Sequence, residues 1–249
     1  MKTGKYFTLV ELLVVVGIIA LLAGLILPAV VGGAQQGRIT QAKSDMNAIQ
    51  MALAQMDQTY DRILKLETSG TDAGKAKFIK PSSAIDPLEQ SLDSHLSTTV
   101  KTTKFIVLGP KDNKHNLISG DKKFSSDRED AYNAFIAELT LTGGTGTYKQ
   151  NLRKIKFLEP NKNFDPSKNY YDADNLPHLW RDPWGNPYAI MINIDGTDRV
   201  VKPDVPANGK FIMSKTAVYS RGPNGEDNKG RNANEGGDKL DDDIATWHK

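Results

Sequence analysis

An apolar run close to the amino terminus constrains this chain more than any other feature. From Leu12 to Val31 there are twenty residues without a charge, and Glu11 is the single carboxylate at the start of the run. As a helix the run would be about 30 Å long, which matches the hydrocarbon core of a bilayer. It is longer than the apolar core of a secretory signal, and no small-residue cleavage site ends it. We therefore expect a membrane-spanning helix.

Two interpretations of Glu11 are open at this point. A charged side chain at membrane depth costs roughly 2.5–3.5 kcal/mol, so an unforced one indicates a function. Alternatively, the run is a plain signal anchor and Glu11 lies among the lipid headgroups. Removing Lys2 and Lys5 from the 32 basic residues leaves 30, which equals the 30 acidic residues. The positive charge before Phe7 favours a cytoplasmic amino terminus with the rest of the chain translocated.

The segment FTLVEL at residues 7–12, followed by an apolar helix, resembles the start of type IV pilins and of type II secretion pseudopilins. The resemblance implies cleavage of a short basic leader between Tyr6 and Phe7 and methylation of the new amino terminus. In this family a Glu stands four residues after that Phe and a Pro often stands twenty-one after it, which are the places of Glu11 and Pro28. Phe7, Glu11 and Pro28 are therefore the assembly residues that the resemblance implies. The family's leader normally ends in Gly, whereas this one ends in Tyr6.

The helical pattern continues beyond Gly32 and Gly33 as an apolar stripe with alternating steps of three and four residues. Its members are Ile39, Ala42, Met46, Ile49, Leu53, Met56, Tyr60 and Ile63. Such a stripe is either a coiled-coil seam or one face of a helix laid on a sheet, and the strands predicted elsewhere favour the sheet. Polar residues between them, among them Asp45 and Gln50, predict a solvated face.

Shorter patterns predict the remaining elements. We expect one helix from Phe7 to about Leu66, with weak points at Pro28, Gly32 and Gly33. The other expected elements are a short helix at residues 86–96, a strand at Phe105–Leu108, a helix after the Ser126–Glu129 capping box and a turn at Gly143–Gly146. They are followed by a strand at Tyr188–Ile194 paired through Asp195-Gly196 with Arg199–Val201, and by a strand within Phe211–Ser220.

This order of elements predicts an α+β fold, in which a long N-terminal helix packs on a small C-terminal antiparallel sheet. With the resemblance, this is the pilin fold, in which one half of the helix spans the membrane and the other half is soluble. The expected division is a leader at 1–6, a membrane or filament-core helix at 7–31 and the soluble half of the helix at 32–66. A variable insertion follows at 67–171, and the sheet with a metal-binding loop occupies 172–249.

The segment Asp182–Tyr188 reads DPWGNPY and is unusually dense in turn-forming residues. Two prolines hold φ, Gly and Asn favour turns, and Trp184 and Tyr188 supply apolar area that anchors the turn. The segment resembles the DPWGNPY of major pseudopilins residue for residue. The resemblance implies a structural entry to the sheet rather than a catalytic site.

The carboxyl-terminal region contains a glycine-rich loop with acidic residues at both ends. Alternate residues of an extended strand point the same way, so Asp241 and Asp243 could bind one calcium ion together, while a solvated acidic tail is the alternative. A chain without cysteines also needs another means of ordering such a loop. The resemblance to major pseudopilins favours calcium, with Asn224 and the carbonyl of Arg221 as further ligands. The family has Asp where Asn224 stands.

No pattern predicts catalysis. His95, His115, His178 and His248 are scattered and make no zinc pattern, and no nucleophile elbow or phosphate loop is present. No basic stripe predicts nucleic acid as a partner.

The resemblance implies the following partners: other copies of the chain in a helical filament, a prepilin peptidase, an inner-membrane secretion or pilus assembly machinery, and membrane lipid before assembly. It also implies an inner-membrane location with the C-terminal domain in the periplasm. A type IV pilin, a minor pseudopilin, and a ligand-binding or enzymatic ectodomain on a signal anchor are the alternatives.

Overall fold

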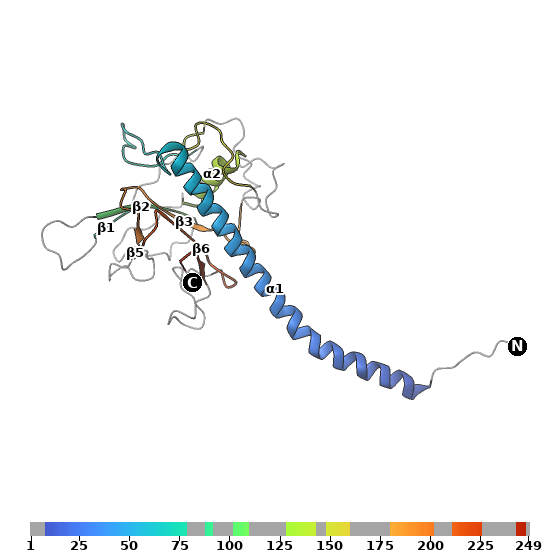
Figure 1. Ribbon diagram of the computed structural model, residues 1–249. Coiled ribbons are helices and arrows are strands. Elements are labelled where there is room, and N and C mark those ends of the chain that lie inside the picture. The colour runs from blue at the N-terminus through green and yellow to red at the C-terminus, as the bar shows by residue number, and fades with distance from the viewer. Residues whose placement is uncertain are drawn as a thin grey trace. The chain divides into compact units, whose positions relative to one another are not determined.

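The computed structural model shows an α+β chain with a long N-terminal helix and a small antiparallel sheet (Figure 1). It describes residues 8–78, 88–91, 102–109, 128–142, 148–159, 180–201, 211–225 and 243–247, with the backbone alone at 25–32, 88–91, 102, 128–130 and 201. The chain divides into two units, residues 1–40 and 41–249.

Helix α1 runs from Leu9 to Tyr60, a single helix of 52 residues. It continues through Pro28, Gly32 and Gly33, the positions predicted to be its weak points. It ends earlier than the predicted Leu66, because Asp61 takes the left-handed conformation with φ of 56°. A residue in that conformation directly after the last helical residue is a common way for helices to stop.

The main sheet has five antiparallel strands in the order β1-β2-β3-β6-β7. These strands are β1 (Leu88–Ser91), β2 (Thr102–Leu108), β3 (Ala189–Asn193), β6 (Thr216–Ser220) and β7 (Ile244–Ala245), and a separate pair is formed by β4 (Val200–Val201) and β5 (Phe211–Ile212). The register places Val107 opposite Met191 and Tyr219 opposite Ala245. Two strands come from residues 67–171, so the sheet is not confined to residues 172–249 as expected.

Both faces of the central strands are covered. One face carries a cluster that includes Phe105, Met191 and Tyr219, with Phe211 of β5 and Trp247 packed against it. Because alternate strand residues point to opposite faces, Ile106, Ile190, Ile192 and Val218 face the other side, where all four are fully buried. Every residue of β3 and β6 is therefore buried.

The second half of α1, within residues 41–60, lies on the sheet. Ala42, Met46, Ile49, Leu53 and Met56 are each at most 1 % exposed. The side-chain amide of Gln50 donates to the carbonyl of Thr216 in β6 at 3.2 Å, and the Tyr188 hydroxyl donates to Asp45 at 3.0 Å. The stripe is thus one face of a helix laid on a sheet, as the sequence favoured. Asp45 and Gln50 contradict the predicted solvated face, because both bond to groups of the sheet layer.

Helix α2 (Arg128–Thr140) confirms the helix predicted after Ser126–Glu129 and packs against β2. Its residues from Ala131 to Thr140 are all buried, and the hydroxyl of Tyr132 donates to the carbonyl of Trp180 at 2.6 Å. The predicted turn at Gly143–Gly146 lies outside the described residues.

Two predictions about secondary structure and strand pairing are wrong. Residues 88–91 form strand β1 instead of part of a helix, because their backbone pairs with the edge of β2. Val200 and Val201 do not return along β3, because β2 and β6 already occupy both edges of that strand; they pair with β5. Backbone pairing between distant segments decides both cases, and local sequence patterns contain no information on it.

Candidate assembly surface and metal centre

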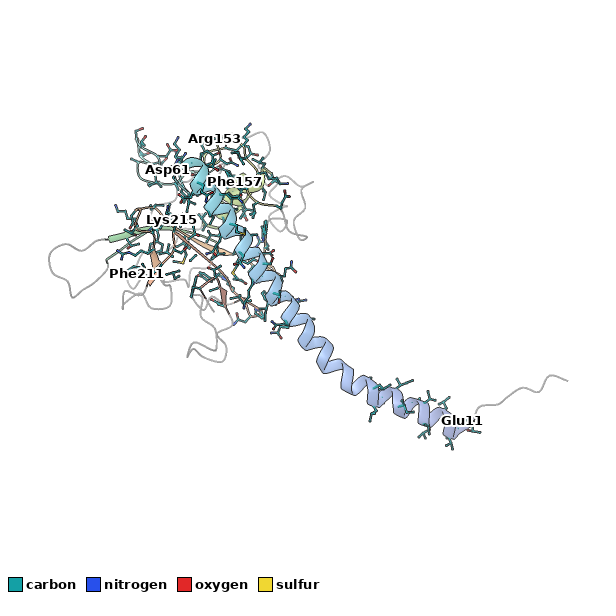
Figure 2. All side chains as sticks on the ribbon, in the orientation of Figure 1. Glu11, Asp61, Arg153, Phe157, Phe211 and Lys215 are labelled. Atoms are coloured by element: carbon teal, nitrogen blue, oxygen red, sulfur yellow. The ribbon has the colours of Figure 1, made fainter. Side chains whose placement is uncertain are left out.

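The first half of α1 presents large apolar side chains to solvent. Those between Leu9 and Leu22 are 49–79 % exposed: Leu9, Val10, Leu12, Leu13, Val14, Val15, Val16, Ile18, Ile19, Leu21 and Leu22. Glu11 is the single charged residue of α1 before Arg38. Contiguous exposed apolar surface of this kind marks sites of protein or membrane interaction. In Figure 2 these side chains project from the start of α1 around Glu11.

Glu11 caps the start of this helix. Its carboxylate accepts hydrogen bonds from the Thr8 backbone N–H and from the Thr8 hydroxyl, both at 2.8 Å, and the Thr8 hydroxyl accepts one from the Glu11 N–H at 3.3 Å. This reciprocal arrangement is a capping box, and its sequence signal is the spacing Thr8-x-x-Glu11. Tyr6 and Phe7 lie outside the described residues, and Pro28 is described only as backbone within α1.

No helix in the described part of the chain combines the length and the apolar character needed to cross a membrane. The membrane span predicted for residues 7–31 stays a prediction.

The turn that begins at Asp182 is organised by the buried carboxylate of that residue. One carboxylate oxygen accepts hydrogen bonds from the backbone N–H groups of Trp184 at 3.0 Å and Asn186 at 2.7 Å. The other accepts one from the hydroxyl of Ser220 at 2.7 Å, and the Ser220 oxygen accepts one from the Gly222 N–H at 3.1 Å. Burial raises the pKa of the Asp182 carboxyl, and the hydrogen bonds from Ser220, Asn186 and Trp184 oppose this shift. Asp182 therefore joins the DPWGNPY turn to the end of β6.

Strands β6 and β7 bring two of the four predicted metal ligands to neighbouring positions. Tyr219 lies opposite Ala245 and Ser220 opposite Ile244, so the same antiparallel register places Arg221 opposite Asp243. Arg221 is 9 % exposed and Asp243 is 1 % exposed. Asn224 lies on the exposed side of the turn that follows Arg221, and Asp241 lies outside the described residues.

The predicted ligands of this region can be compared with what calcium requires. Asp243, the Asn224 side chain and the Arg221 carbonyl are oxygen donors of the kind that calcium prefers. The Arg221 guanidinium donates to the carbonyl of Gly225 at 3.4 Å, which places a positive charge inside the same turn. Within the ranges given above, no group of three or more histidine, aspartate or glutamate residues converges as a metal site would. The described residues therefore contain single oxygen donors of a suitable kind without a converging set, and Asp241 lies outside them.

A cavity of about 260 Å³ lies at the carboxyl end of α1. It is bounded by Asp57, Asp61 and Arg62, by the segment that follows α1, by Asn193 of β3 and by Lys215 just before β6. The Lys215 ammonium donates to the Asp57 carboxylate at 2.7 Å, and this hydrogen bond raises the pKa of Lys215. The pair joins α1 to the segment before β6 at the surface, where such a pair contributes little to stability.

A buried polar network, which sequence reasoning missed, lies beside the same end of α1. The Glu138 carboxylate of α2 accepts hydrogen bonds from the backbone N–H groups of Gln150 at 2.6 Å and Asn151 at 2.9 Å. The Asn151 amide donates to the carbonyls of Glu138 and Ile155, and its oxygen accepts one from the Tyr60 hydroxyl at 2.8 Å. The sequence signal for this network is Glu138 itself, an acidic residue on a helix face that is otherwise apolar. The network fixes residues 150–155 against α1 and α2.

No protein-family model matches this chain, and no curated protein and no solved structure is significantly similar to it.

Proposed function

We propose that this chain is a structural subunit of a type II secretion pseudopilus, most like the major pseudopilin, and polymerises through α1 to support protein export. One observation carries the proposal: a single helix is apolar and exposed from Leu9 to Leu22, and amphipathic and buried on one side from Ala42 to Met56. The α+β arrangement of helix and antiparallel sheet is compatible with the pilin fold. The apolar half would pack against the same half of other subunits, and the globular unit would surround that core.

Glu11 would select the assembly partner. In the free chain its carboxylate bonds to Thr8 of the same helix. In the filament core, we propose that it pairs with the amine of Phe7 from a neighbouring subunit. Breaking a buried charge pair costs about 3–5 kcal/mol, which is enough to prevent assembly. The helix-loosening Pro28 would let the core helices adapt to one another.

The proposed route to the filament begins in the inner membrane, with the C-terminal unit in the periplasm. A prepilin peptidase would cut between Tyr6 and Phe7, and the secretion or pilus assembly machinery would then extract the subunit from lipid. The mature chain should therefore begin with a methylated Phe7. Mass spectrometry of the assembled protein tests this step, and an intact Met1 on assembled chains would contradict it.

We also propose that calcium orders the carboxyl-terminal loop through Asp241, Asp243, Asn224 and the Arg221 carbonyl. A ligand that binds only the folded form stabilises it by about 2.7 kcal/mol when present at a hundredfold excess over Kd. Magnesium should replace calcium poorly, because it demands tighter octahedral geometry.

Thermal unfolding of the full chain in detergent micelles tests the calcium site. We expect a higher melting temperature with calcium than with chelator, and equal values for the double variant Asp241→Ala, Asp243→Ala. The matched control is Asp198→Ala, which removes an exposed carboxylate from another turn and should keep the calcium effect. Equal melting temperatures of the wild-type chain with calcium and with chelator would leave the tail as a solvated acidic end.

Electron micrographs of cells that express the chain with a prepilin peptidase and assembly machinery test the filament itself. Filaments built from this chain, absent for Glu11→Gln, support the proposal. Long surface filaments would favour the type IV pilin alternative, and a minor pseudopilin would appear only as a trace component of filaments made by another subunit. Processed chains that never assemble would favour the membrane-anchored ectodomain.

A further inference from the structure

A single tyrosine ring at the carboxyl end of α1 holds two arginine side chains. The guanidinium carbons of Arg62 and Arg153 lie 5.7 and 5.5 Å from the centre of the Tyr60 ring. These distances are within the range of cation–π contacts. Phe157 packs edge-on against the same ring, with 6.1 Å between the ring centres. Figure 2 shows Arg153 and Phe157 at this end of α1, near Asp61.

Neither of these two guanidinium groups forms an ion pair within the described part of the chain. The two guanidinium carbons are no more than about 11 Å apart, since each lies within 5.7 Å of the same ring centre. Lys149 and Lys154 add exposed charge nearby in the chain, while Lys156 pairs with Glu159 at 2.8 Å.

The arrangement is fixed by buried groups. The Tyr60 hydroxyl accepts a hydrogen bond from the backbone N–H of Arg153 at 2.9 Å and donates one to Asn151 at 2.8 Å. Asn151 and Glu138 beneath it are both fully buried. A surface that is ordered before binding loses little conformational entropy when a partner arrives.

Exposed apolar residues flank Arg153 and Lys154 in the chain. Leu152 is 52 % exposed and Ile155 is 38 % exposed, one on each side of Arg153 and Lys154 in the chain. We refer to Tyr60, Arg62, Leu152, Arg153, Ile155 and Phe157 as the Tyr60 patch. Aromatic and arginine side chains surrounded by apolar contacts are typical of the residues that dominate binding energy at protein interfaces.

We propose that the Tyr60 patch binds an acidic segment of a partner protein, with two carboxylates on one side and an apolar residue between or beside them. Carboxylates two residues apart in an extended segment are about 6.7 Å apart, which lies within the upper limit that the shared Tyr60 ring sets for the two guanidinium groups. Arginine forks bind carboxylates through paired hydrogen bonds, and this favours a partner with fixed geometry over a diffuse lipid surface. The inference is independent of the proposed filament role, because it rests only on residues of the globular unit.

Fluorescence anisotropy of the full chain in nonionic detergent micelles tests the proposal. The probe is a fluorescein-labelled peptide of sequence GSDLDLDSG, and its neutral counterpart is GSNLNLNSG. We expect saturable binding of the acidic peptide and none of the neutral one. Arg62→Gln and Arg153→Gln should each weaken binding roughly tenfold, as loss of one dominant contact does.

Lys43→Gln is the matched control, since it removes one exposed cation from α1 outside the patch. If Lys43→Gln weakens binding as much as the two arginine variants do, net charge rather than the patch is responsible and the proposal is wrong. Equal binding of the two peptides would also overturn it. Circular dichroism of each variant must match the wild-type chain, and Arg153→Lys, which keeps the charge and loses the fork, should bind more weakly than wild type.

Hydrogen–deuterium exchange separates a protein partner from a membrane. Residues 148–159 should gain protection when the acidic peptide is added to neutral micelles. They should gain none when phosphatidylglycerol replaces part of the detergent without peptide. Protection by phosphatidylglycerol alone, lost in Arg153→Gln, would assign the patch to an anionic lipid surface and overturn the proposal.

Discussion

The two halves of α1 have the same secondary structure and opposite surroundings. Between Leu9 and Leu22 the large apolar side chains are at least 49 % exposed, whereas Ala42, Met46, Ile49, Leu53 and Met56 are at most 1 % exposed. The first half is apolar on every side, and the second half alternates an apolar stripe with polar residues. A helix that is apolar all round requires a cover on all sides, and one with a stripe requires a single partner surface. Among the described residues, only those of the second half of α1 pack on such a surface of the same chain.

The largest expected effect is on assembly. Leu13→Arg places a charge in the apolar half, which costs roughly 2.5–3.5 kcal/mol for each subunit at membrane depth. Met51 is 65 % exposed on the second half of the same helix, so Met51→Arg is the matched control. We expect no filaments from Leu13→Arg and normal filaments from Met51→Arg, counted on electron micrographs. Normal filaments from both variants would remove the functional difference between the two halves.

The next effect is on folding stability, for which we expect the second half of α1 to be sensitive to substitution and the first half to be insensitive. Leu53 is fully buried, so Leu53→Ala should lower the free energy of unfolding by about 2–5 kcal/mol through lost contacts and a cavity. Leu13→Ala should change it by less than about 0.5 kcal/mol, because the side chain is exposed in the single chain. Urea unfolding of the full chain in micelles, followed by tryptophan fluorescence, measures both. A large loss for Leu13→Ala would mean that the apolar half packs within its own chain.

A smaller effect is expected at the turn that supports the sheet beneath the second half of α1. Asp182→Ala removes the acceptor of three hydrogen bonds and should cost about 1–3 kcal/mol. Thermal unfolding measures this, and assembly should continue below the melting temperature. A variant as stable as the wild-type chain would show that the turn does not depend on this carboxylate.

The same carboxyl predicts a pH dependence. Burial raises the pKa of Asp182 above its ordinary value of 3.8, so the folded chain holds this proton more tightly than the unfolded chain. The contribution to stability is present below the ordinary pKa and is lost as the pH rises through the raised pKa. The side-chain amide of Asp182→Asn does not titrate, so this variant does not lose stability in this way. Its stability relative to the wild-type chain should therefore increase as the pH rises above 3.8. A constant difference across that range would contradict the assignment.

The smallest effect concerns the polar contact between helix and sheet. The Tyr188 hydroxyl donates to Asp45 at 3.0 Å, and Tyr188→Phe removes this donor without removing the ring. We expect a loss of about 1 kcal/mol in the free energy of unfolding, with filament assembly unchanged. A loss as large as that of Leu53→Ala would show that polar contacts, rather than the apolar stripe, hold the helix on the sheet.

The sequence predicted those parts of the fold that depend on local pattern. The steps of three and four from Ala42 to Met56 predicted the buried face, and the apolar runs at Phe105 and Ala189 predicted the strands. Pairing between distant segments was not predictable, as Leu88 and Val200 show, because backbone hydrogen bonds carry no side-chain signature. Asp45 was assigned to solvent by its polarity alone, and its partner Tyr188 is 143 positions away.

Some features of the candidate site have a local sequence signal, and others depend on contacts between distant segments. The exposed apolar half follows directly from its composition, and the capping role of Glu11 was present in the Thr8-x-x-Glu11 motif. The register that sets Arg221 opposite Asp243 depends on β7, a strand of two residues that is too short to detect from sequence. The Tyr60 patch joins residues about ninety positions apart through Glu138 and Asn151, and no local motif contains that information.

Cysteine cross-linking can show whether the apolar half of α1 is covered by other subunits, because the sequence has no cysteines and any introduced one is unique. Leu13→Cys and Met51→Cys each place a single thiol on an exposed apolar position of α1, one in each half. After mild oxidation of the assembled protein, we expect disulfide-linked dimers for Leu13→Cys and monomers for Met51→Cys. Monomers for Leu13→Cys, or equal amounts of dimer for both, would contradict the claim that the apolar half of α1 is covered by the same half of other subunits.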